Sequence, residues 1–187
     1  NCLKALGVKI LKKNKNYLVY GNGLGSFRKP SKKNLYCGNA GTLVRLLSGL
    51  LATANFKTKL TGDNSLNKRP MKRIIDPLSK IGANFFPKKK TTLPLYIQGT
   101  NMPLAQKFEE KIGSAQIKSS ILLASLNTPG ITTIQAASSR DHTENLLQYI
   151  NADIKTKKLK KGNVITLKGM KNLFSFDLEV FGDQSSC

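Results

Sequence analysis

Arg45 lies one turn inside an apolar stretch that follows a small, glycine-rich polar turn, residues 38–42. The leucines after this turn recur at helical spacing, so the turn is predicted to open a helix. A helix amino terminus presents unpaired N–H groups and a partial positive charge, and glycine lets an anion approach the backbone. A guanidinium one turn inside would add charge-assisted hydrogen bonds. These residues therefore indicate an anion site, although an Asn39 cap on an ordinary helix, with Arg45 extended to solvent, explains the pattern equally well.

Two further arginines occupy matching places near predicted helix starts. Arg69 directly precedes Pro70, a residue that suits a first helical turn, and Arg140 lies at the matching place one structural unit later. Either arginine alone is explained as a solvated residue, but their recurrence favours an anion site. Arginine suits such a site because its planar fork matches phosphate and carboxylate.

Ser114 and Gln116 open a further predicted helix. Alone they indicate a helix cap and an exposed amide, so Gln116 becomes a ligand candidate only if its helix faces the same cleft. His142, beside Asp141, could serve as a general base. It has no nucleophile or metal partner at a recognisable spacing, and the turn GNGLGS is a weak nucleotide signal. The residues by themselves predict anion binding and assign no catalytic group.

The predicted elements that carry these residues recur along the chain. Three segments each have the pattern of a helix end, a strand, a lysine-rich turn, a strand and a glycine, and they align at Gly7, Gly82 and Asn151. They are roughly 70 residues apart, so the repeat is a whole supersecondary unit. Two helical patterns joined by a short strand lie between successive hairpins. The chain is therefore predicted to hold nearly three copies of a mixed α/β unit, the first represented only by its last hairpin.

Apolar periodicity predicts four helices in the two complete units. The first extends over about residues 40–54 and the third over about 114–126. Pro77 inside the second implies a kink or a misplaced boundary. A strand is also predicted over residues 174–181, before a turn. The periodic positions are Met71, Ile74, Ile75 and Leu78 in the second helix and Thr143, Leu146, Leu147 and Ile150 in the fourth.

Composition favours a globular protein in a reducing compartment. The chain is 40% hydrophobic, and no stretch has the roughly 18 uncharged apolar residues that a spanning helix needs. The cysteines form no CxxC pair, which argues against a disulfide framework or a zinc site. The net charge is +21, but many of the lysines lie in predicted hairpins, which is typical of a solvated face. A cytoplasmic protein with no nucleic-acid or membrane partner is expected.

Five segments, in order, resemble successive motifs of the 5-enolpyruvylshikimate-3-phosphate synthase family. Two of them, SAQIKS and RDHTE, are similar to its second, bacterial class, and the match spans essentially the whole chain. The five segments are GNAGTLVRLLSGLLA, LTGDNSLNKRPMKRIIDPLSKIGA, SAQIKSSILLASLNTPGITTI, SRDHTENLL and VFGDQSS.

The resemblance implies an α/β (α+β) fold: an enolpyruvyl-transferase lobe built of pseudo-threefold βαβαββ repeats, an inside-out α/β barrel. Residues 1–181 would form this lobe, and residues 182–187 would begin the return to a second lobe. The implied reaction transfers the enolpyruvyl group of phosphoenolpyruvate to the 5-hydroxyl of shikimate 3-phosphate, releasing phosphate. No metal or organic cofactor is implied, and the full-length enzyme is expected to be a monomer.

The resemblance also implies which residues border phosphoenolpyruvate. Asn39, Gly41 and Arg69 would line this site, with Arg69 holding the anionic groups and Gly41 leaving room beside it. Gln116 would touch both substrates. A glycine at position 41 resembles the herbicide-sensitive form of the family, in which a larger residue confers glyphosate tolerance.

A second set of residues is implied for shikimate 3-phosphate. The helix start at 114–116 and the arginine of the RDHTE motif would hold it, while the helix that contains Arg45 would contribute structure and electrostatic field. The residues are Ser114, Ala115, Gln116 and Arg140 for the substrate, with Thr42 and Arg45 in support.

Two parts of the family pattern have no counterpart in these 187 residues. They are an early Lys-Ser-x-x-x-Arg segment and nearly all of the second lobe, which carry the family's acid–base residues. The chain is therefore expected to be a fragment with no catalytic residue of its own and little or no turnover alone. Two alternatives remain: the sister enolpyruvyl transferase acting on UDP-N-acetylglucosamine, whose reactive-cysteine loop has no match here, and a non-catalytic basic module that binds polyanions.

Overall fold

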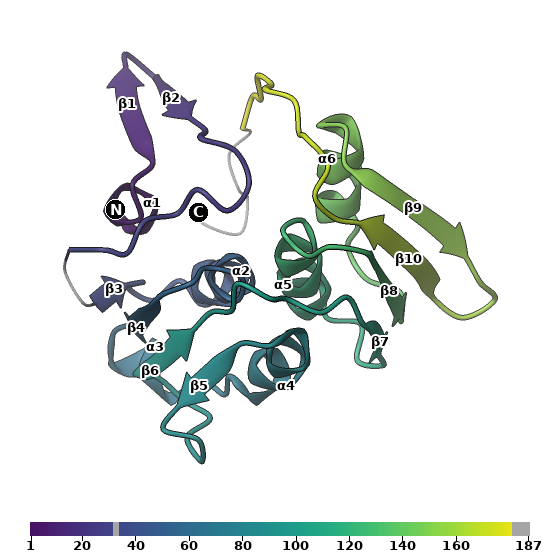
Figure 1. The fold of residues 1–187 in the computed structure, drawn as a ribbon, viewed down its shortest axis with the longest axis horizontal. Coiled ribbons are helices and arrows are strands. Elements are labelled where there is room, and N and C mark those ends of the chain that lie inside the picture. The colour runs from purple at the N-terminus through teal and green to yellow at the C-terminus, as the bar shows by residue number, and fades with distance from the viewer. Residues whose placement is uncertain (32–33, 181–187) are drawn as a thin grey trace.

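The computed structural model describes residues 1–31 and 34–180, which contain two complete copies of one βαβαββ unit (Figure 1). The first unit comprises β3 (Asn34–Tyr36), α2 (Gly41–Leu51), β4 (Lys57–Thr61), α3 (Asn64–Lys68), α4 (Lys72–Ile81), β5 (Asn84–Phe86) and β6 (Leu95–Gln98). The second comprises β7 (Lys107–Glu110), α5 (Ala115–Ser125), β8 (Ile131–Ala136), α6 (His142–Tyr149), β9 (Asp153–Lys158) and β10 (Asn163–Lys168).

The two units have the same sheet topology. Each forms a four-stranded sheet, in the order β3-β4-β6-β5 in the first unit and β7-β8-β10-β9 in the second. The first two strands of each sheet are parallel and are joined by a helix, whereas the remaining pairs are antiparallel. The predicted α+β class and the predicted repeat are therefore confirmed.

A hairpin at the start of the chain has the same order as the end of each unit, a helix followed by two antiparallel strands. It contains α1 (Cys2–Ala5), β1 (Lys9–Lys13) and β2 (Asn16–Tyr20), with the two strands antiparallel. The positions that align the three hairpins all have left-handed backbone, with φ of 93° at Gly7, 120° at Gly82 and 70° at Asn151. Glycine and asparagine tolerate this conformation best, which explains why these residue types mark the repeat.

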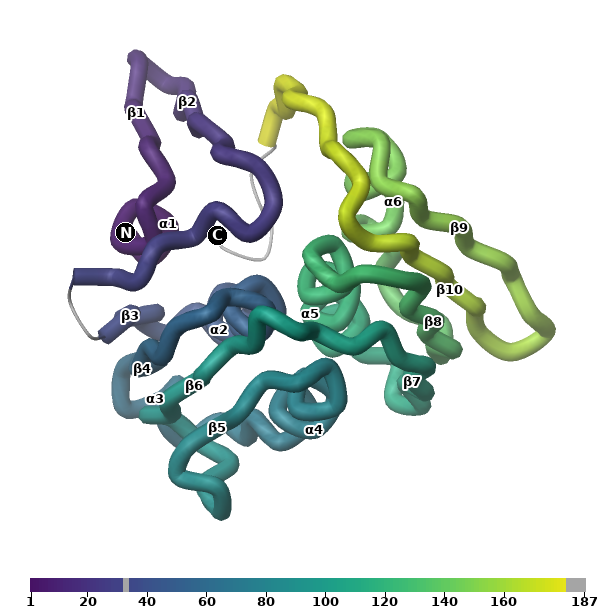
Figure 2. Tube along the Cα trace, in the orientation of Figure 1, coloured from purple at the N-terminus to yellow at the C-terminus, as the bar shows by residue number. Residues whose placement is uncertain are grey.

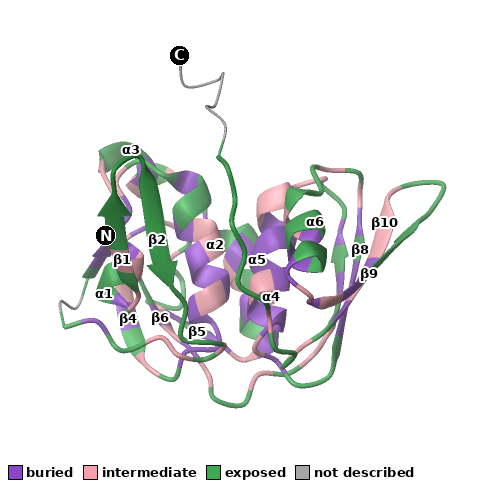
Figure 3. Cartoon of the chain, turned by 90° about the horizontal axis from the view of Figure 1, so that it is seen from above, coloured by how far each residue is buried: buried purple, intermediate pink, exposed green. Residues whose placement is uncertain are grey.

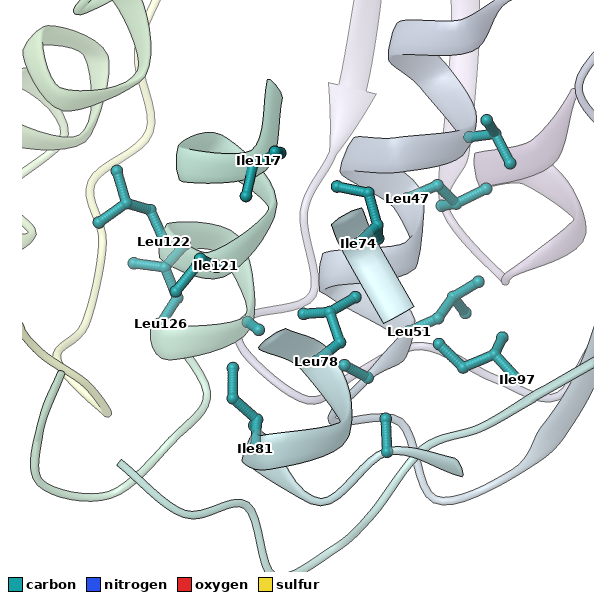
Figure 4. Packing of buried hydrophobic residues seen from close by; sticks show 14 of the residues in the cluster. Leu47, Leu51, Ile74, Leu78, Ile81, Ile97, Ile117, Ile121, Leu122 and Leu126 are labelled. Carbon is teal, nitrogen blue, oxygen red and sulfur yellow. The ribbon is translucent and has the colours of Figure 1, made fainter. Parts of the chain in front are cut away.

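Helices α2, α4, α5 and α6 lie between the two sheets, and α2 packs directly against α5 (Figure 3). Buried aliphatic side chains of α2, α4 and α5 point toward one another (Figure 4). The approach of α2 to α5 is very close at Gly49, where a Cβ atom would lie 2.2 Å from the Ser120 carbonyl oxygen. This contact holds the amino-terminal ends of both helices on the same side of the molecule.

The second predicted helix is α4, and a short helix that was not predicted, α3, precedes it. α3 ends at Lys68, Arg69 follows as its extended C-cap residue, and α4 begins at Lys72. Pro70 therefore lies in the connection rather than in a first helical turn. Pro77 is inside α4, so the alternative of a misplaced boundary there is wrong.

Residues 174–180 form no strand, so that part of the prediction for 174–181 is wrong. Within residues 1–31 and 34–180, no strand pairs with this segment, and alternation alone cannot supply a pairing partner (Figure 2). It packs on α6 instead: the Phe174 amide donates to the Ile150 carbonyl, and the rings of Phe176 and Tyr149 meet edge to face. The predicted turn at 182–187 lies outside the described residues.

Candidate active-site half

Asn39 and Arg69 meet beside the start of α2. Arg69 Nη2 donates to Asn39 Oδ1 over 2.7 Å. A Cβ atom on Gly41 would lie 2.9 Å from Arg69 Nη1. The guanidinium can therefore lie over this helix start because residue 41 has no side chain. Ala40, not Asn39, is the N-cap residue, and it provides no side-chain cap. The Asn39-cap alternative is therefore wrong, and the first N–H groups of α2 are left without a side-chain acceptor from the N-cap residue.

Arg45 does not extend to solvent but reaches across to α5. Its Nη1 donates to Gln116 Oε1, and Gln116 Nε2 donates to Thr42 Oγ1 over 2.7 Å. The Gln116 amide thus bridges two turns of α2 from the first turn of α5. Helix α5 therefore faces the same cleft as α2, which is the condition that the sequence had left open for Gln116.

The region around Arg45 concentrates positive charge. Burial lowers the pKa of the Arg45 guanidinium, and the nearby positive charges of Arg69 and Arg73 lower it further. None of the three ion pairs formed within residues 1–31 and 34–180 involves an arginine. The arginine charge around the start of α2 is thus left uncompensated by carboxylates in the described part of the chain, which suits an anionic ligand.

The start of α5 is fixed by Glu110, a residue that the sequence analysis missed. Its buried carboxylate accepts hydrogen bonds from the backbone amides of Ile112, Gly113 and Ser114 at 2.9–3.1 Å. Ser114 is the N-cap of α5, and its Oγ accepts from the Ile117 amide. The cap predicted for Ser114 is confirmed. Because both its side chain and its amide are engaged, Ser114 belongs to a rigid turn.

An open pocket joins the two helix starts to the start of α6. Ala115, Gln116 and Arg140 line it together with Thr42 and His142. Arg140 is exposed, and its carbonyl oxygen accepts a hydrogen bond from the buried Lys118 ammonium. The structure therefore brings Ala115, Gln116 and Arg140 together around one pocket, and Gln116 links this pocket to Arg45. Ser114 does not line the pocket but caps α5 next to it.

A family match accounts for this arrangement. The family model described as EPSP synthase (3-phosphoshikimate 1-carboxyvinyltransferase) matches residues 1–187. The chain belongs to the EPSP synthase family. The 3-phosphoshikimate 1-carboxyvinyltransferase of Paramagnetospirillum magneticum is 40% identical over 99% of this chain and 42% of its own length. That of Rhodospirillum rubrum is 44% identical over 91% of this chain and 38% of its own length.

Solved structures agree with the sequence relatives. EPSP synthase from Acinetobacter baumannii superposes with a TM-score of 0.84 at 39% identity, covering 92% of this chain and 38% of that chain. The chain thus spans about two fifths of the length of the EPSP synthases it matches. The fold implied by the resemblance is confirmed for this segment.

The structure also places the other candidate reactive side chains of this EPSP synthase segment. His142 is exposed and lines the same pocket as Arg140. Within the described ranges, no three histidine, cysteine or acidic side chains cluster as a metal site would require. Burial and the neighbouring Cys2 raise the pKa of the Cys37 thiol to about 12, so Cys37 stays protonated and is a poor nucleophile. No helix in the described part is long and apolar enough to cross a membrane.

Proposed function

We propose that the protein containing this segment transfers the enolpyruvyl group of phosphoenolpyruvate to the 5-hydroxyl of shikimate 3-phosphate. The 5-hydroxyl oxygen adds to C2 of phosphoenolpyruvate and loses its proton, while C3 gains a proton. The tetrahedral intermediate then loses phosphate from C2 and a proton from C3, which restores the double bond in the product. The observation that carries the proposal is the pairing of two helix starts, α2 and α5, through Gln116, beside arginines that have no acidic partner in the described residues.

The arrangement matches the physical demand of this reaction. Two multiply charged anions must be held side by side, which requires fixed cations and N–H donors placed before the chemistry begins. Asn39, Gly41 and Arg69 would hold phosphoenolpyruvate, with Arg45 and Thr42 keeping Gln116 in place between the substrates. Ala115, Gln116 and Arg140 would hold shikimate 3-phosphate at the pocket, and Ser114, the N-cap residue of α5, would contribute beside them.

The remaining parts of a family-length enzyme would supply the acid–base groups. The helix starts of this segment would form one side of the active site, and a second lobe of the same enzyme would close over it. The proposal further includes action without a metal or organic cofactor, a monomeric enzyme and a cytoplasmic location.

Loss of either site arginine is expected to reduce kcat/KM at least tenfold, which corresponds to about 1.4 kcal/mol of transition-state stabilisation. Arg69→Ala should act mainly on the KM for phosphoenolpyruvate and Arg140→Ala on the KM for shikimate 3-phosphate. The measurement is phosphate release by the family-length protein with each substrate varied in turn. Arg28→Ala serves as control, because the Arg28 side chain packs on Gly7, away from the pocket.

Three outcomes would contradict the proposal. The first is activity within about twofold of the parent in both site variants. The second is phosphate release that depends on UDP-N-acetylglucosamine instead of shikimate 3-phosphate, which would identify the sister enzyme. The third is binding that falls with salt equally for any polyanion, with no preference for shikimate 3-phosphate, which would identify a charge-driven binding module.

Gly41→Ala is expected to raise the KM for phosphoenolpyruvate several-fold and leave the KM for shikimate 3-phosphate nearly unchanged. The added methyl would meet Arg69 Nη1 at 2.9 Å, so the guanidinium must move away from Asn39. Inhibition by glyphosate should weaken in the same variant. Steady-state kinetics with each substrate varied tests this, and a proportional rise in both KM values would show that the methyl disturbs more than Arg69.

A further inference from the structure

Lys118 and Glu144 form an ion pair that is hidden from solvent beneath the pocket. The Lys118 ammonium, in the second turn of α5, lies 2.6 Å from Glu144 Oε1, in the first turn of α6, and the two side chains are 1% and 5% exposed. Neither residue lines the pocket. The pair is therefore placed to act on the site only through other residues.

A second contact of the Lys118 ammonium links the ion pair to a residue of the pocket, Arg140. Lys118 Nζ donates to the Arg140 carbonyl oxygen over 2.9 Å. The carbonyl is part of the backbone from which the Arg140 side chain projects to the pocket. A neighbouring contact strengthens the link, since the Ser119 and Thr143 hydroxyls hydrogen-bond over 2.6 Å. The backbone at Arg140 is thus tied to α5, whose first turn carries Gln116.

Packing alone does not call for charges here. Burying a lysine and a glutamate costs desolvation energy, and apolar side chains of the same size often hold two elements together at least as well. Glu144 is also poorly satisfied: its oxygens have no hydrogen-bond partner within the described residues, and only the ammonium offsets its charge. An apolar pair could not donate a hydrogen bond to the Arg140 carbonyl, as the Lys118 ammonium does. The Glu144 carboxylate holds this ammonium in place.

We propose that Lys118 and Glu144 are positioning residues that fix Arg140 relative to the first turn of α5, and so set the affinity for the phosphorylated acceptor. The effect on affinity rests on the proposed function, whereas the positioning of Arg140 does not. The pair defines the distance between the arginine and Gln116, and it acts without touching the ligand.

The test is the double variant Lys118→Met/Glu144→Gln in the family-length protein, which removes both charges at nearly constant volume and leaves no buried ion unpaired. The KM for shikimate 3-phosphate is expected to rise about tenfold, while the KM for phosphoenolpyruvate stays within about twofold. A matched control is Lys72→Met/Asp76→Asn, which removes an exposed ion pair of α4. The proposed effect on affinity would be wrong if both KM values changed equally, or if the KM for shikimate 3-phosphate did not change.

Amide hydrogen exchange in the ligand-free protein tests the positioning itself, whatever the substrate is. Exchange at residues 145–148 should become at least severalfold faster in the double variant and stay unchanged in β9, β10 and the control. These are the first hydrogen-bonded amides of α6, beginning with the bond from the Asn145 amide to the Asp141 carbonyl, next to Arg140. If the parent releases no phosphate with shikimate 3-phosphate, the proposed function fails and exchange alone decides the positioning. Unchanged exchange at 145–148 would show that the pair does not hold this helix start and Arg140.

Discussion

Lys118→Met is expected to lower the free energy of unfolding by about 3–5 kcal/mol, the usual cost of removing one partner of a buried ion pair. The methionine fills nearly the same space, so lost packing contributes little. The Glu144 carboxylate, 5% exposed, would stay in the interior with no cation beside it. The Arg140 carbonyl would lose its donor as well. Urea unfolding of the chain followed by circular dichroism measures the change.

Two further variants separate charge from packing at this position. Lys118→Met/Glu144→Gln should recover most of the lost stability, because no buried ion remains without its partner. Lys72→Met, which breaks an exposed pair with side chains 66% and 53% exposed, should change stability by about 1 kcal/mol or less. A loss below about 1 kcal/mol in Lys118→Met would mean that Glu144 gains water or a proton at little cost, and the pair would then have no strong structural role.

Local pattern was enough to predict the repeat and most helices. Left-handed positions need glycine or asparagine, and helix faces need apolar residues at helical spacing, so both leave a trace in the sequence. The start of α4 was misplaced because Pro70 suits both a first helical turn and a connection. The prediction of a strand over 174–181 was wrong for residues 174–180. Alternating apolar and polar residues show that a segment could have two different faces, but they do not show which strand it would pair with.

The residues of the candidate site could be named from the sequence, but the contacts between them could not. Resemblance and helix starts pointed to Arg69, Arg140 and Gln116, yet the bridge from Arg45 to Gln116 depends on how α2 crosses α5. Lys118 and Glu144 lie within quoted motifs, but a charge within a motif gives no sign that it is buried. Such pairings join residues of different elements, and only the packed structure shows them.

The hairpin lysines and the arginines at the start of α2 occupy different parts of the molecule. The lysines of the hairpins, such as Lys12, Lys89 and Lys157, are exposed at or near hairpin ends, in agreement with the prediction of a solvated face. Arg45 and Arg69 are partly buried at helix starts and make hydrogen bonds to amide oxygens. The large net charge is therefore a poor guide to the ligand, whereas the few arginines indicate where an anion would bind.

Gly49→Ala is expected to destabilise the chain by about 1–3 kcal/mol or more, as overpacking of a close helix contact does. The new Cβ atom would lie 2.2 Å from the Ser120 carbonyl oxygen, a separation that real Cβ atoms essentially never show. Because the obstacle is backbone, no rotation of a side chain can relieve it. The helices α2 and α5 must move apart, against the bond from Ser120 Oγ to the Arg45 carbonyl oxygen.

The same displacement should reach the candidate site. Gln116 bonds Arg45 and Thr42 only while the first turns of α2 and α5 stay at their present distance, so both KM values should rise in the family-length protein. Gly21→Ala is the matched control, since a Cβ there meets nothing within 4 Å, and stability and kinetics should stay near those of the parent. Gly49→Ala could instead lower stability and leave both KM values unchanged. The helix contact would then support the fold without setting the geometry of the site, and the hydrogen bonds of Gln116 would tolerate the displacement of the helices.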